Sequence, residues 1–90
     1  MADTYQGPVK VLGGDGILLT TGSATLEHDP EQGTWEGELE TLRGTAVAGK
    51  ALVVALEIPD AGLGRAQLTP AGERGEMALS AVVGLGPQPF

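Results

Sequence analysis

The chain contains no cysteine, and this absence excludes disulfide bonds, thiol catalysis and thiolate metal sites. It has one histidine, His28, so a zinc site would need carboxylates for most of its ligands, which is unusual. Aromatic residues are scarce as well, because Tyr5, Trp35 and Phe90 are the only three. A core must therefore be built mainly from valine, leucine, isoleucine and alanine. No pattern indicates a metal or another cofactor, and we expect none.

Basic residues are also few, five against twelve acidic ones, so the net charge is −7. This charge opposes contact with phosphate backbones and anionic membranes, and we expect neither a nucleic-acid partner nor a membrane partner. Long apolar runs are lacking too, since the longest, Ala51 to Leu56, is far shorter than a membrane span. The first five residues have neither the basic nor the apolar stretch of a secretory signal. We therefore expect a soluble protein of the cytoplasm.

What the chain does have is enough residues for one domain, which we place over residues 1–90 with a Gly/Pro-rich tail at 84–90. A core of this size is marginal, and no disulfide reinforces it. Burial against another surface would add stability. We therefore expect a homo-oligomer or a protein partner.

Fifteen glycines and six prolines interrupt the sequence every eight to twelve residues, with short runs rich in valine, leucine, isoleucine and threonine between them. This spacing is typical of an all-β domain. No segment keeps the apolar spacing of a helix through three turns, so no helix longer than one or two turns is expected. We predict six antiparallel strands in a barrel or a sandwich. The predicted strands are 7–12, 17–27, 33–40, 51–58, 64–68 and 76–83.

Residues 33–40 alternate strictly between apolar and acidic positions, which predicts a strand with one buried face. The preceding strand and the loop at 29–32 make this a hairpin, with His28 facing Gly33 and Leu26 facing Trp35. In that register no two carboxylates lie directly opposite each other. Leu26, Trp35 and Leu39 then line the barrel interior, and a carrier of an apolar ligand is an alternative function for such an interior.

The outer face of this strand carries Glu36, Glu38 and Glu40, and such a stripe is typical of a solvated strand face. Binding of a hard cation and paired-carboxylate catalysis remain open. The neighbouring His28-Asp29 is interpreted as the opening of a turn before Pro30, because adjacent strand residues point to opposite faces. A hydrolase using Glu36 or Glu38 with His28 ranks third among the functions, and we assign no catalytic residue and no metal ligand.

The strand at 51–58 differs, because it is apolar at nearly every position and this favours cover on both faces. We predict an interface formed by Leu52, Val54 and Leu56 together with Phe90 of the tail. The alternate set on the same strand is Val53, Ala55 and Ile58. A central strand lying under a loop is an equally simple explanation, and Phe90 either folds back onto the barrel or docks on a neighbouring subunit. These features favour a non-catalytic binding or assembly module that self-associates.

Four short segments resemble a small bacterial domain family of unknown function that is at times appended to flavin-dependent monooxygenases. They are the start at 5–8, the hairpin at 26–37, the segment at 64–68 and the end at 86–90. The resemblance implies a compact β domain. The family's hairpin is richer in aromatic and basic residues, whereas glutamates dominate here, and no monooxygenase part is present.

Overall fold

The computed structural model describes residues 3–45 and 47–90, and these form six β-strands and no helix. The strands are β1 (Thr4–Leu12), β2 (Leu18–Asp29), β3 (Thr34–Leu42), β4 (Leu52–Ile58), β5 (Gly62–Arg74) and β6 (Met77–Gly84). All neighbours are antiparallel, and the sheet closes into a barrel in the order β1-β2-β3-β6-β5-β4. The predicted all-β fold is confirmed. Within these residues no helix is long and apolar enough to cross a membrane.

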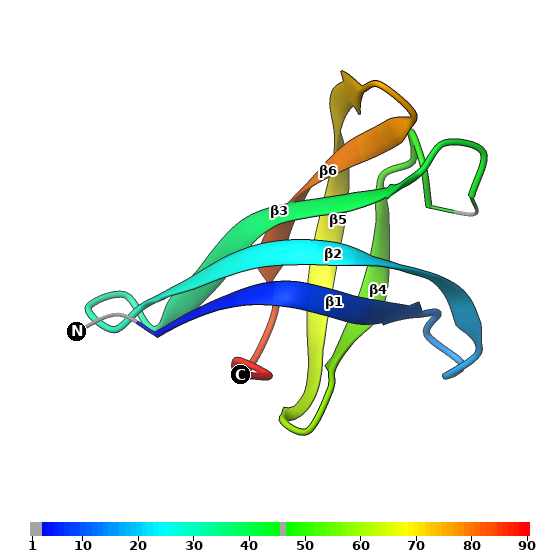
Figure 1. Cartoon of the computed structure of the whole chain (residues 1–90). Helices are drawn as coiled ribbons and strands as arrows, with labels where there is room; N and C mark the ends of the chain where they lie inside the picture. The colour runs from blue at the N-terminus through cyan, green and yellow to red at the C-terminus, as the bar shows by residue number, and fades with distance from the viewer. Residues whose placement is uncertain (1–2, 46) are drawn as a thin grey trace.

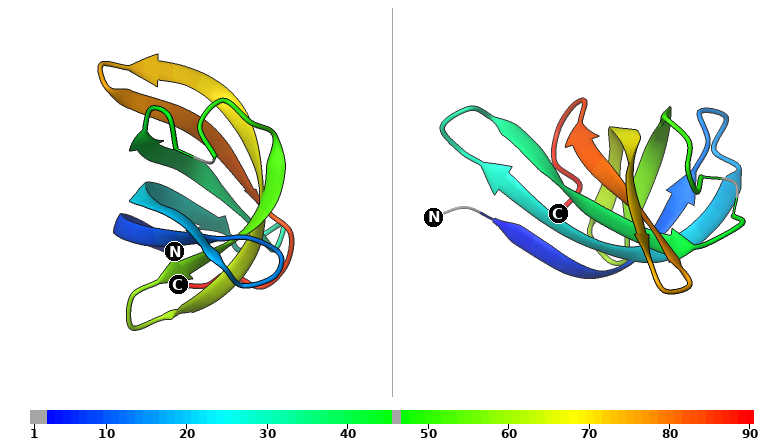
Figure 2. Two further views of the ribbon diagram at one scale, coloured as in Figure 1. Left: turned by 90° about the vertical axis from the view of Figure 1, so that its right-hand side faces the viewer. Right: turned by 90° about the horizontal axis from the view of Figure 1, so that it is seen from above.

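The barrel has two curved layers, one of β1, β2 and β3 and one of β4, β5 and β6, and the strands of the two layers cross (Figure 1). Viewed from above, the strands curve around a common interior (Figure 2). Most neighbouring strands share seven or more residue pairs, but β1 and β4 share three, from Lys10–Glu57 to Leu12–Ala55. The ring therefore closes through a short seam.

The core follows from the alternation of the strands, since inward residues are buried and their neighbours face out. It is aliphatic with one indole, as the composition predicts. Val47 joins it from the connection between β3 and β4. The buried core residues are Val9, Val11, Ala24, Leu26, Trp35, Leu39, Val47, Val54, Leu56, Ile58, Ala66, Leu68 and Val82.

The tail after β6 folds back over the barrel. The Trp35 indole Nε1 donates a hydrogen bond to the Gly86 carbonyl oxygen at 2.9 Å. The Phe90 ring meets the Trp35 ring edge-on, with 6.2 Å between centroids, and lies 6.5 Å from the Tyr5 ring. Pro89 is buried against the backbone of Gly64, where a Cβ would come within 2.8 Å of the proline ring. Two places were predicted for Phe90, its own barrel and a neighbouring subunit. In the structure Phe90 packs on its own barrel.

The predicted strands all occur, but β5 is longer than predicted. It continues through Pro70 to Arg74, with a bulge between Pro70 and Gly72. Beyond Leu68 this strand no longer pairs with β4, so the missing N–H of proline leaves no ladder bond unmade on that side. The turn falls instead at Gly75 and Glu76.

The hairpin of β2 and β3 forms, but the predicted pairing was wrong by two residues. Asp29 faces Thr34 and His28 faces Trp35, so Leu26 faces Gly37 rather than Trp35. A shift of two keeps every side chain on its predicted face, because the side-chain period of a strand is two. It also places two carboxylates opposite each other, those of Glu27 and Glu36, contrary to the prediction.

Candidate functional site

The outer face of the sheet where β2, β3 and β6 pair carries a row of glutamates. We call a row of residues that face one another across neighbouring strands a rung. On the first rung Glu27 faces Glu36, and Glu36 in turn faces Val83. All three are exposed. Like charges directly opposite on a sheet are destabilising, so this rung is unfavourable as long as nothing cationic lies between its carboxylates.

The second rung lies two residues further along the same strands. Here Thr25 faces Glu38, and Glu38 faces Ala81. Each of the two β3 glutamates therefore has an apolar neighbour on the β6 side. Lysine and arginine side chains have an apolar stem and a cationic end. A carboxylate beside an apolar side chain can therefore contact both parts of such a side chain.

On the third rung an arginine of the chain itself contacts the glutamate. Glu40 faces Leu79 on β6, and the Glu40 carboxylate Oε1 accepts a hydrogen bond from the guanidinium Nη1 of Arg74 at 3.2 Å. Leu79 is 9% exposed, whereas Val83 on the first rung is 49% exposed. The chain thus supplies its own arginine to the third rung. In the part of the chain that the structure describes, neither Glu27, Glu36 nor Glu38 takes part in an ion pair.

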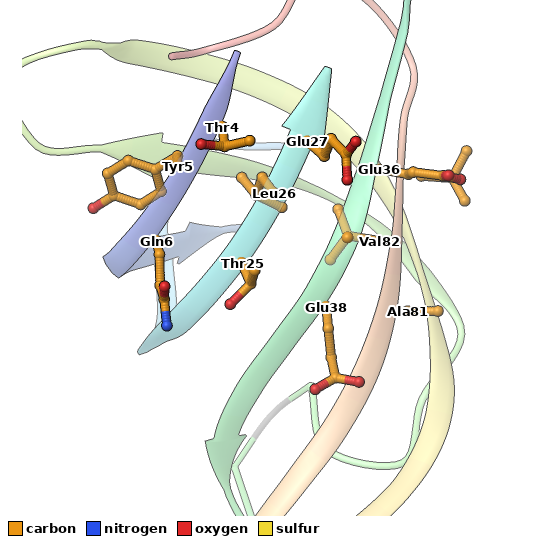
Figure 3. A pocket seen from close by; sticks show the side chains of 12 residues that line it. Thr4, Tyr5, Gln6, Thr25, Leu26, Glu27, Glu36, Glu38, Ala81 and Val82 are labelled. Carbon is orange, nitrogen blue, oxygen red and sulfur yellow. The ribbon is translucent and has the colours of Figure 1, made fainter. Parts of the chain in front are cut away.

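The first two rungs line a hollow of about 630 Å³ (Figure 3). Thr25 and Glu27 of β2 and Glu38 of β3 stand along it, and Ala81 and Val82 of β6 lie on its far side. We call this hollow the acidic groove. Sequence reasoning found its glutamates but missed its β6 wall, because local alternation does not say which strand lies next to β3. The lining residues are Thr4, Tyr5, Gln6, Thr25, Leu26, Glu27, Glu36, Gly37, Glu38, Ala81, Val82 and Val83.

The charge of the whole chain is concentrated on this side of the barrel. Residues 1–42 contain eight acidic residues and one basic residue, while residues 43–90 contain four of each. The net charge of −7 therefore belongs to the part that forms β1, β2 and β3. The other acidic residues of this part of the chain add to the attraction that the three lining carboxylates exert on an approaching cation.

His28 and Asp29 are the last two residues of β2, paired with Trp35 and Thr34, and the turn follows them. The Asp29 carboxylate Oδ1 accepts the backbone N–H of Glu31 at 2.9 Å and that of Gln32 at 3.4 Å. These bonds fix the loop between β2 and β3. Among residues 3–45 and 47–90 there is no group of three or more histidine, cysteine or acidic side chains placed to hold a metal ion.

The three residues predicted to line a ligand-binding interior, Leu26, Trp35 and Leu39, do share the core. Each is at most 1% exposed, and they pack within a cluster that Tyr5 and Phe90 cover. An apolar ligand would have to displace the tail to reach them.

The predicted interface residues need a correction. Val54 and Leu56 point into the barrel, where they are 1% and 0% exposed, and Leu52 packs against the same core. Strand alternation accounts for this, since the even positions of β4 face inward. Val54 and Leu56 are therefore not accessible to another molecule, Leu52 is only partly exposed, and Phe90 packs on its own barrel.

The outward positions of β4 and β5 form a different surface. Val53 and Leu63 are exposed there, with Ala55 between them and Arg65 opposite Ala55. β4 is apolar at nearly every position because its inward residues belong to the core and its outward residues Val53 and Ala55 are apolar as well. The alternation signal could not reveal this, because both faces are apolar.

No family model, no curated protein and no solved structure matches the chain. The resemblance to the small bacterial β-domain family therefore stays a prediction.

Proposed function

We propose that the protein is a non-catalytic binding module whose acidic groove takes lysine or arginine side chains from an extended segment of a partner protein. The observation that carries this proposal is the comparison of the three rungs. The rung at Glu40 is neutralised by Arg74, whereas the rungs at Glu36 and Glu38 hold carboxylates beside apolar side chains with no internal cation. A partner's cationic side chain would occupy these two rungs as Arg74 occupies the third.

The spacing of the carboxylates supports an extended partner. Glu36 and Glu38 are two residues apart on one strand, and alternate residues of any extended segment repeat at the same distance of about 7 Å. A lysine at every second position therefore matches both rungs. Its aliphatic stem would lie over Val83 or Ala81 while its ammonium group meets the carboxylate.

The groove chemistry supports binding rather than catalysis. Its side chains offer carboxylates, hydroxyls, one amide and apolar surface. The single imidazole of the chain lies outside the lining, on an inward-facing position opposite Trp35. A proton-transfer reaction at the groove would have to use exposed glutamates alone.

The test is a titration with a dye-labelled peptide in which lysine alternates with serine, followed by fluorescence anisotropy at low salt. We expect binding that weakens as salt is added, because exposed charge pairs are screened. The double variant Glu36→Gln/Glu38→Gln should lose at least about tenfold in affinity, equivalent to about 1.4 kcal/mol. A peptide in which glutamine replaces lysine should not bind.

The matched control is Asp60→Asn/Glu76→Gln, which removes the same two charges from turns away from the groove. Asparagine tolerates the positive φ of 61° at position 60. Equal loss of affinity in both double variants would show attraction by net charge alone and would refute the groove. Absence of binding by the lysine peptide to the wild type would refute it as well.

A further inference from the structure

A second surface, distinct from the acidic groove, collects exposed apolar side chains at the junction of β1, β2, β4 and β5. Leu18 of β2 faces Leu12 of β1, and Leu12 faces Ala55 of β4. Ala55 then faces Arg65 of β5. Three apolar residues from three strands therefore form one continuous rung that ends in a cation.

The positions beside this rung extend the apolar surface. Val53 and Leu63 are 42% and 58% exposed, and Leu18 is 51% exposed. Leu12, Val53, Ala55 and Leu63 line a shallow hollow of about 290 Å³, in which Arg65 is the one charged residue. Ile17, the most exposed large apolar side chain found in the structure, stands beside Gly16 at its rim. We call this surface the β4–β5 face.

Charge determines which occupant suits the β4–β5 face. The ionisable side chains at its paired strand positions are Lys10, Glu57 and Arg65, and Asp15 and Asp60 lie in the adjoining turns, so the charges nearly balance. In the ring, β1 and β6 separate β4 and β5 from the acidic β2 and β3. Two copies of this chain, each with a net charge of −7, therefore meet with less repulsion through their β4–β5 faces than through the acidic β2 and β3.

We propose that the β4–β5 face is a self-association surface, on which two copies of this chain form a two-fold symmetric dimer. A two-fold contact requires the same patch to complement itself, and an apolar hollow with a protruding apolar side chain at its rim meets that requirement. The dimer covers side chains that are otherwise exposed to water. It leaves both acidic grooves open, so it stands independently of the proposed function.

The experiment is sedimentation velocity of the full chain from low micromolar to near-millimolar concentration. We expect a monomer–dimer equilibrium that salt strengthens, because screening reduces the repulsion between two acidic copies. Peptide binding in the groove should respond to salt in the opposite direction. Failure of one proposal is therefore distinguishable from failure of the other.

Two matched variants sharpen this test, Leu63→Glu on the β4–β5 face and Leu42→Glu at the end of β3. Both leucines are 58% exposed on strands, so the two substitutions add the same charge at equal exposure. We expect Leu63→Glu to weaken dimerisation at least about tenfold and Leu42→Glu to leave it within about twofold of the wild type. Val53→Glu should repeat the effect of Leu63→Glu.

Three results would overturn the dimer. They are a wild type that stays monomeric over the whole range, an equal effect of Leu63→Glu and Leu42→Glu, and species that keep growing beyond the dimer. Circular dichroism of each variant verifies the fold.

Discussion

At the residue scale, the contact between Gly84 and Trp35 shapes the part of the barrel that the tail covers. A Cβ at position 84 would overlap the Trp35 indole, so the ring lies flat against this glycine. Gly37 of β3 has a different role, since it allows a close approach of β2: a Cβ there would overlap the Thr25 carbonyl oxygen.

Gly84→Ala should therefore destabilise the protein by about 1–3 kcal/mol, the usual range for overpacking a core. Its matched control is Gly86→Ala, two residues further on, where a Cβ would meet nothing within 4 Å. Urea unfolding followed by Trp35 fluorescence measures both. If the two variants unfolded at the same urea concentration, the packing of Trp35 on Gly84 would be wrong.

In the part of the chain that the structure describes, the hydroxyl groups of Thr41, Thr45 and Ser80 are buried without a hydrogen-bond partner, and Thr41 and Ser80 are 0% exposed. Burying such a group without a partner is unfavourable. The substitutions Thr41→Val and Ser80→Ala should therefore each stabilise the protein by about 1 kcal/mol. Ser23→Ala, at an exposed strand position, serves as the control and should change little.

Urea unfolding checks these hydroxyl variants as well. A clear loss of stability in Thr41→Val would mean that its hydroxyl has a partner, such as a buried water. The stabilising effect would then be contradicted.

At the element scale, the hairpin of β2 and β3 separates what local sequence determines from what it does not. The inner and outer faces were predicted correctly, because alternation fixes them. The register was wrong by two residues, since Asp29 pairs with Thr34 before the turn starts instead of belonging to the loop. Both registers bury the same side chains, so burial could not distinguish them.

The strand β4 shows a second limit of prediction. Its apolar character indicated an interface, but the residues named for it, Val54 and Leu56, are core residues. Only the pairing with β1 and β5 shows that Val53 and Ala55 face outward beside Leu12 and Arg65. Periodicity cannot choose between two apolar faces, so the choice requires the neighbouring strands.

At the scale of the whole molecule, composition and spacing were sufficient for an all-β fold but not for its strand order. The sequence neighbours β3 and β4 are separated in the ring, and β6 lies between β3 and β5. The β6 wall of the acidic groove and the rung that crosses β1, β2, β4 and β5 both depend on that order. Neither surface could be assembled from the sequence alone.

The three residue pairs between β1 and β4 have a consequence for how the native barrel opens. This ladder is the shortest in the ring, so its local opening should need less free energy than global unfolding. In native-state hydrogen exchange, the amides of residues 10–12 and 55–57 that hydrogen-bond across this seam should exchange faster than the amides that bond between β3 and β6. Equal protection in both ladders would contradict this. An opened seam exposes two strand edges, which are templates for pairing with another chain. The rate of aggregation should therefore follow the opening of this seam more closely than the global stability of the barrel.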